Sequence, residues 1–166
     1  MWLFLFLLAT MPVPELDVVL NSQPGRLSVQ MAVNRPMPEE WSQALSGGAQ
    51  VSITYRLHLF RNRRWLWDQR LAAHRMVVTA QRDPLTGVFS LAAELDGEIL
   101  ASGQASSLEE AVFWMTHPPS AEIPVPFRHE ALWLVTRAEF LSRYRLLVIP
   151  STVGTDWVTR AVPEAQ

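Results

Sequence analysis

The feature that most constrains this chain is the alternation of apolar and polar residues in short segments separated by turns. The clearest case is Val51–Leu59, in which every second residue is apolar and Ser, Thr, Arg and His lie between. Side chains of a strand point to opposite faces in turn, so the pattern predicts a half-buried strand. Alternation over Glu15–Ser22 and Arg26–Val33, around the turn Gln23-Pro24-Gly25, predicts an opening antiparallel hairpin.

The middle of the chain predicts further hairpins. Trp65–Gln81 is expected as one long strand or two broken ones, and the turn residues Asp83–Gly87 follow it. Phe89–Leu95 alternates again. The dipeptide Asp96-Gly97 is a strong signal for a tight turn, after which Glu98–Gln104 returns as the partner strand.

Two short helices interrupt the strands. Proline and the acidic pair at Pro36–Glu40 favour a helix start, and Trp41 and Leu45, four residues apart, are expected to pack on the sheet. Ser106–Glu110 matches a capping box, which predicts a second helix.

After the second helix the pattern changes. Ala131–Phe140 is apolar on both faces, which favours a central strand. Tyr144–Ile149 and Trp157–Val158 are expected as further strands. Because most links are short, pairing should be antiparallel. We therefore expect residues 13–166 to form a single mainly β domain, an antiparallel β-sandwich or strongly curved sheet with two short helices.

Residues 1–12 are interpreted separately. Trp2–Ala9 are eight consecutive apolar residues, too few for a membrane-spanning helix, which needs about 20. The run is typical of the apolar region of a secretory signal, although no basic residue precedes it. A hydrophobic first strand is the alternative, but the run does not alternate and prolines follow it. The sequence therefore predicts export to the periplasm or cell envelope, with membrane contact only through this segment if it is not cleaved.

Composition narrows the function classes. The chain has no cysteine, which excludes disulfides, zinc–thiolate sites and cysteine nucleophiles. A net charge of −2 gives no general attraction for nucleic acid. The four histidines are not in a metal-ligand spacing, and no serine lies in a nucleophile-elbow motif. We predict no catalytic, metal or cofactor site, and therefore no enzyme.

A group of carboxylates at one hairpin is the other candidate for a metal site. Glu94, Asp96 and Glu98 are expected on one side of this hairpin. A calcium site would need about six oxygen ligands, so a solvated turn is favoured.

Charge is distributed unevenly along the chain. Arg56–Arg82 contains seven arginines and one aspartate, a net of +6, whereas Asp83–Glu122 contains seven acids and no base. One interpretation is cross-strand ion pairing between these neighbouring segments. The other is a partner surface rich in arginine and tryptophan, the residues most enriched at binding hot spots. Its candidate residues are Arg61, Arg63, Arg64, Trp65 and Trp67.

Three motifs resemble a known family. The run Arg63–Asp68, the pair Leu85-Thr86 before a strand, and the helix Ser107–Ala111 are similar to segments of the bacterial "domain of unknown function 4390" proteins. The resemblance would cover Glu15–Trp157. It implies an exported proteobacterial protein without an established activity. Members are often encoded near a membrane sensor kinase, which implies a link to envelope signalling.

Two functional hypotheses follow. The first is a non-catalytic module of the cell envelope that docks on a membrane or periplasmic protein. The alternative is a periplasmic binder of a small apolar ligand, suggested by seven Trp and seven Phe in so short a chain. The first predicts an exposed Trp65 or Trp67 beside Arg63 and Arg64, and the second predicts an apolar internal cavity of a few hundred Å³.

Overall fold

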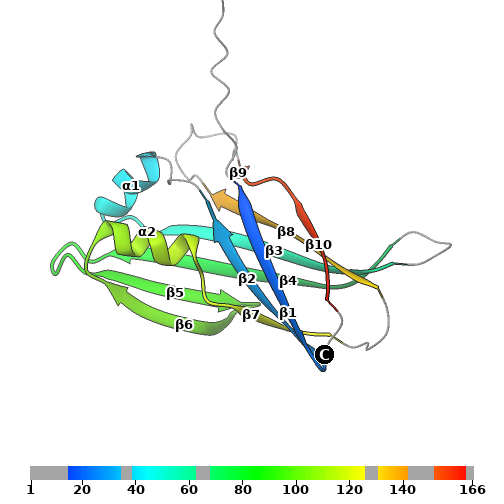
Figure 1. Cartoon of the computed structure of the whole chain (residues 1–166). Coiled ribbons are helices and arrows are strands. Elements are labelled where there is room, and N and C mark those ends of the chain that lie inside the picture. Colours follow the sequence, from blue (N-terminus) through cyan, green and yellow to red (C-terminus); the bar gives the residue numbers. More distant parts are fainter. Residues whose placement is uncertain (1–14, 35–38, 63–67, 126–130, 142–151, 164–166) are drawn as a thin grey trace, which may run out of the picture.

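The computed structural model of the chain describes residues 15–34, 39–62, 68–125, 131–141 and 152–163. In these residues a small antiparallel sheet and two short helices lie on the same face of a larger antiparallel sheet (Figure 1). The predicted class, a mainly β antiparallel sandwich with two short helices, is confirmed.

The small sheet has the strand order β1-β2-β7. The predicted opening hairpin is confirmed: β1 (Leu16–Gln23) pairs with β2 (Arg26–Val33) around Gly25, whose φ of 78° suits glycine. β7 (Ala121–Pro124) pairs with the other edge of β2 and was not predicted. Its four residues are too few for alternation to be visible in the sequence, and only pairing with β2 makes them a strand.

The large sheet has the order β10-β8-β3-β4-β5-β6, and β9 pairs with the same β8. Its strands are β3 (Val51–Arg61), β4 (Gln69–Arg82), β5 (Phe89–Leu95), β6 (Glu98–Ala105), β8 (Leu132–Leu141), β9 (Thr152–Gly154) and β10 (Val158–Ala161). β4 is one long strand, and its register with β3 shifts at Leu59/Phe60. β8 lies between β3 and β10, as expected for a central strand. The strand expected at Tyr144–Ile149 lies outside the described residues.

The helices close the core as the sequence predicted. α1 (Glu39–Ser46) buries Trp41 and Leu45, and the Trp41 ring meets Phe140 edge-on at 5.4 Å. α2 (Leu108–Thr116) begins with a cap in which the Ser107 hydroxyl accepts from the Glu110 N–H at 3.2 Å. In the described part of the chain, neither helix has the length and apolar character needed to cross a membrane.

The two faces of the large sheet differ in burial. Alternate residues of β3, including Ile53, Tyr55 and Leu57, point into the core and are fully buried. The Tyr55 hydroxyl donates to the Met115 carbonyl at 2.9 Å, which ties β3 to α2. The residues between them, including Arg56 and the half-buried His58, lie on the opposite face. We call this opposite face of the large sheet the outer face.

Candidate docking surface on the large sheet

The candidate partner residues predicted from the sequence lie at and beyond the end of β3. Arg61 is the last residue of that strand, and its Nη2 donates to Gln69 Oε1 at 2.8 Å across the β3–β4 pair. Arg63, Arg64, Trp65 and Trp67 lie outside the described residues. Their predicted exposure is therefore not tested. Arg61 is the register partner of the buried Leu132, so it points to the inward face of the sheet.

The predicted ion pairing between the basic and acidic segments is not what the structure describes. Glu139 on β8 contacts Arg56, and Glu122 contacts Arg26 of the small sheet. Acids of the second segment instead accept hydrogen bonds within their own turns and helix. Asp83, for example, accepts a hydrogen bond from the Leu85 N–H at 2.8 Å. Among the described residues, the basic and acidic segments meet at His74, whose Nδ1 lies 2.7 Å from the Asp96 carboxylate. Most acids occupy turns and helix ends, where the sheet register cannot bring them opposite an arginine.

Three arginines stand side by side on the outer face. Arg56 on β3 is the register partner of Arg75 on β4 and of Arg137 on β8. Register partners point to the same face of a sheet, and like charges placed directly opposite each other destabilise the pair. We call Arg137, Arg56 and Arg75 the arginine row. It crosses three adjacent strands, and nothing in the burial of the core requires it.

One carboxylate offsets part of this charge. Glu139 Oε2 lies 2.8 Å from Arg56 Nε, and its Oε1 lies 3.3 Å from Arg137 Nε. The second contact is an ion pair only, because the Arg137 Nε–H has no hydrogen-bond acceptor among the described residues. Among those residues the Arg75 side chain makes no ion pair. The row therefore keeps a net positive charge.

Aromatic rings lie directly beside the arginine row. The Trp157 ring is 5.3 Å from the His58 ring and 5.3 Å from the guanidinium carbon of Arg137. Phe60 meets the other side of His58 edge-on at 6.4 Å. The Trp157 side chain is 45% exposed, so part of an aromatic face stays in water beside guanidinium groups. The arginine–aromatic surface is defined as the arginine row together with His58, Phe60 and Trp157.

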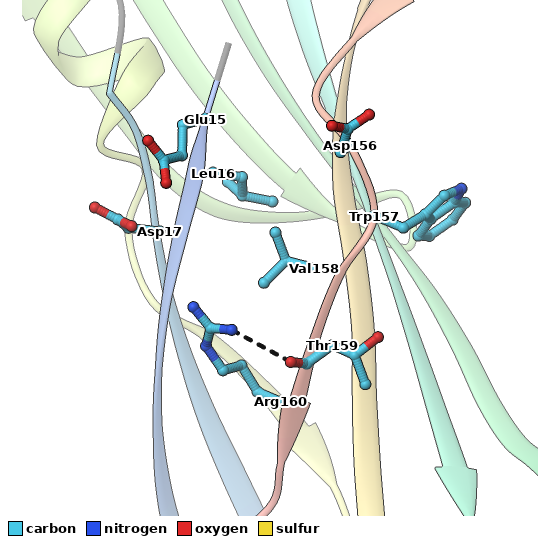
Figure 2. Close-up of a pocket in the computed structure, with 8 residues that line it drawn as sticks. All are labelled: Glu15, Leu16, Asp17, Asp156, Trp157, Val158, Thr159 and Arg160. Carbon is cyan, nitrogen blue, oxygen red and sulfur yellow. Dashed lines mark hydrogen bonds between the residues drawn. The ribbon is translucent and has the colours of Figure 1, made fainter. Parts of the chain in front are cut away.

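The break between β9 and β10 precedes Trp157. At the break Thr155 pairs with Ala138 of β8: its N–H donates to the Ala138 carbonyl at 2.9 Å, and its hydroxyl accepts from the Ala138 N–H at 3.0 Å. Gly154 lies so close to β8 that a Cβ there would be 2.7 Å from the same carbonyl oxygen. Figure 2 shows that Trp157 points away from Val158. Trp157 therefore comes two residues after Thr155, which is buried and hydrogen-bonded to β8, although the Trp157 side chain itself is half-exposed.

The arginines also set the protonation of His58. Partial burial lowers the pKa of His58 below its usual value of 6.5, and the nearby charges of Arg70 and Arg56 lower it further, against the opposing effect of Glu139. Arg70 is the register partner of Phe60 and lies on the same face. At pH 7 the imidazole is therefore mainly neutral and acts as an aromatic ring within a group of permanent cations.

A pocket lies at the junction of the two sheets, on the other side of β10. It is an open groove of about 450 Å³ between β1 and β10 (Figure 2). Its lining includes Glu15, Asp17, Asp156 and Arg160. This groove is open and charged, so it is not the apolar internal cavity that the small-ligand hypothesis predicts.

The carboxylates of the β5–β6 hairpin do not form the predicted one-sided group. The tight turn makes Leu95 the register partner of Glu98, whereas Glu94 is paired with Ile99, so Glu94 and Glu98 point to opposite faces. Asp96 lies in the turn and accepts from the Arg75 N–H at 2.8 Å. Among the described residues there is no group of three histidine, cysteine or acidic side chains able to hold a metal ion.

Comparison with known proteins gives one match. A family model described as a domain of unknown function (DUF4390) matches residues 16–133. The chain belongs to this family. The resemblance predicted from three sequence motifs is thus confirmed. No curated protein and no solved structure matches the chain.

The matched stretch covers only part of the arginine–aromatic surface. It runs from β1 to the second residue of β8 and includes Arg56, His58, Phe60 and Arg75. Arg137 and Trp157 lie beyond it. Sequence reasoning missed the surface because its residues come from three separate strands and from the segment that precedes β10. The alternation of β3 places Arg56 and His58 outside the core, but only the register shows which arginines become their neighbours.

Proposed function

We propose that this protein is a non-catalytic module of the cell envelope that docks on a membrane or periplasmic protein through the arginine–aromatic surface. The observation that carries the proposal is the arginine row, in which three like charges occupy register positions on adjacent strands. Such a row costs stability when nothing binds it. A partner that supplies negative charge recovers that cost at the moment of docking.

The composition of the surface supports protein docking. Arginine and tryptophan are the residues most often found at energetic hot spots, and Trp157 combines 45% exposure with a fixed position against His58 and Arg137. A ring already held in place loses little conformational freedom on binding. In sequence, the predicted partner residues Arg63, Arg64, Trp65 and Trp67 follow directly on β3, which carries the centre of the row.

The compartment in this proposal rests on the N-terminal sequence. The eight apolar residues Trp2–Ala9 are typical of an export signal, and the link to envelope signalling is what the resemblance to the DUF4390 family implies. Export would present the outer face to periplasmic domains of membrane proteins. No observation on the described residues favours the alternative role, binding of a small apolar ligand.

The experiment is site-specific crosslinking in cells. A photoreactive residue replaces Trp157 in a C-terminally tagged chain, and the matched control places it at Val19, which is 62% exposed on the small sheet. We expect a periplasmic or membrane-attached pool and a discrete crosslinked product from position 157 only. The product should disappear when Arg56 and Arg137 are both changed to Glu.

Two results would contradict the proposal. A cytoplasmic pool would show that residues 1–12 do not direct export. Equal crosslinking from positions 19 and 157, or none from position 157 in an exported pool, would show that the outer face is not the docking surface. Circular dichroism of the purified double-Glu variant must match that of the unchanged protein, so that loss of the product is not caused by unfolding.

A further inference from the structure

We infer that the arginine row receives an extended, acidic segment of the partner protein, with carboxylates on alternate residues. The inference rests on the proposed function and names the chemistry of the partner. It follows from the charges of the outer face, from the spacing of the row, and from the way in which Glu139 already occupies one part of it.

Glu139 shows which group the row binds. Its two carboxylate oxygens divide between two members of the row, at 2.8 Å from Arg56 and 3.3 Å from Arg137. The Glu139 side chain is only 15% exposed, whereas that of Arg56 is 47% exposed. Glu139 lies beside the row, opposite Thr54, and Arg56 and Arg75 stay exposed, whereas the Arg137 side chain is only 24% exposed. Guanidinium groups have five N–H donors in a plane, so they can bind a second carboxylate from outside.

The outer face has an excess of positive charge around the row. Register places Arg56, Arg70, Arg75 and Arg137 there, against Glu94 and Glu139 among the described residues of the paired strands. Arg75 and Arg70 have no ion pair within the described part of the chain. Charge complementarity therefore favours an acidic partner segment on the arginine row.

The spacing of the row fits an extended peptide. Neighbouring strands lie about 4.8 Å apart, so three adjacent strands place the outer two arginines roughly 10 Å from each other. Side chains on one side of an extended peptide repeat about every 6.8 Å, because each residue advances about 3.4 Å. A peptide lying across β8, β3 and β4 would bring two alternate carboxylates within reach of the long guanidinium side chains. Trp157, which lies beside Arg137, can then contact an apolar residue next to the acids on the same side of the peptide.

A membrane surface is the less favoured occupant. Binding in a bilayer interface needs apolar side chains that insert between the lipids. Among the described residues of the outer face, the large apolar side chains that are exposed are Trp157 at 45% and Ile99, at the far edge on β6. One half-exposed ring beside the row is sufficient for a peptide contact and provides little area for insertion.

The test uses the purified chain and a fluorescent peptide of alternating glutamate and serine. Its control is the same peptide with glutamine for glutamate. Binding is followed by fluorescence anisotropy at low ionic strength. The variant is Arg75→Gln, and the matched control is Arg160→Gln, an exposed arginine on β10 whose register places it on the opposite face. We expect the glutamate peptide to bind at least tenfold more tightly than the glutamine peptide. Arg75→Gln should weaken binding about fivefold, while Arg160→Gln should leave it unchanged.

Four outcomes would overturn the inference. The first is equal binding of the two peptides, and the second is an equal loss from the two variants. The third is sedimentation of the protein with phosphatidylglycerol vesicles under conditions where neither peptide binds, which would assign the row to a membrane. Self-association seen by analytical ultracentrifugation in the absence of peptide, and lost in Arg75→Gln, would also overturn it in favour of a second copy. Crosslinking from position 157 in cells separates the two proposals. A product of undiminished yield in Arg75→Gln would retain the docking function and refute only the acidic peptide.

Discussion

Removing one arginine from the row should stabilise the folded protein. In Arg75→Gln the side chain keeps much of its aliphatic length and loses its charge. Arg75 stands directly opposite Arg56, and two unit charges about 6 Å apart in water repel each other with roughly 0.7 kcal/mol. Glu139 offsets part of this repulsion by contacting Arg56. We therefore expect the free energy of unfolding to rise by about 0.3–0.7 kcal/mol, within the range measured for cross-strand charge pairs.

The assay is urea unfolding at pH 7, supported by the thermal midpoint, which should rise by about 1–2 °C in a domain of this size. The matched control is Arg26→Gln, which removes a cation that contacts Glu122 at 3.3 Å. The control should be neutral or slightly destabilising, because exposed ion pairs contribute about 0–1 kcal/mol. At about 1 M salt the screening length falls to about 3 Å, and the gain from Arg75→Gln should vanish. A loss of stability in Arg75→Gln, or a gain that persists in high salt, would refute the reasoning about the arginine row.

Three further predictions concern the scaffold. Tyr55→Phe leaves the buried carbonyl of Met115 without its donor and should lower the free energy of unfolding by about 1–2 kcal/mol in urea; an unchanged value would contradict the role of this bond. Burial alone would raise the pKa of the Asp96 carboxyl, but hydrogen bonds from the His74 imidazole and the Arg75 N–H hold this pKa below its usual 3.8. The ionised carboxylate therefore stabilises the folded protein above about pH 4, and this stabilisation is lost as the pH falls through the lowered pKa. Asp96→Asn should therefore flatten the acid limb of stability against pH, and an unchanged slope would exclude this linkage. Gly154→Ala introduces a Cβ 2.7 Å from a carbonyl oxygen of β8 and should cost about 1–3 kcal/mol, which urea unfolding would detect; a neutral effect would show that β9 moves freely.

Local patterns were sufficient to predict most elements of the fold. The alternation in Val51–Leu59 and the turn signal of Asp96-Gly97 correspond to β3 and to the β5–β6 hairpin. The capping box predicted the start of α2. β7 was missed because four residues show no period of their own.

The candidate site was harder to predict than the fold. The sequence pointed to the segment Arg61–Trp67 because basic and aromatic residues are adjacent there. The structure adds a second set that no local pattern joins, with Arg56 and Arg137 separated by 81 positions in the chain. Among the described residues, the ion pairing considered between the two charged segments is seen at His74 and Asp96 only, because charge balance along the chain does not say which side chains are opposite each other.

By itself, the sequence determined the fold class, the inward faces of β1, β2, β3 and β5, and the family to which the chain belongs. The fold class and the inward faces follow from periodicity and turn chemistry, and the family follows from short motifs; each acts over a few neighbouring residues. Only the tertiary structure decided that Arg137, Arg56 and Arg75 form a row and that Trp157 stands beside it. Strand order and register are set by packing of the whole core, and a shift of register by one residue would turn every side chain of a strand to the other face. A surface made from three strands and the segment before β10 is therefore a property of the folded sheet and of no single segment in it.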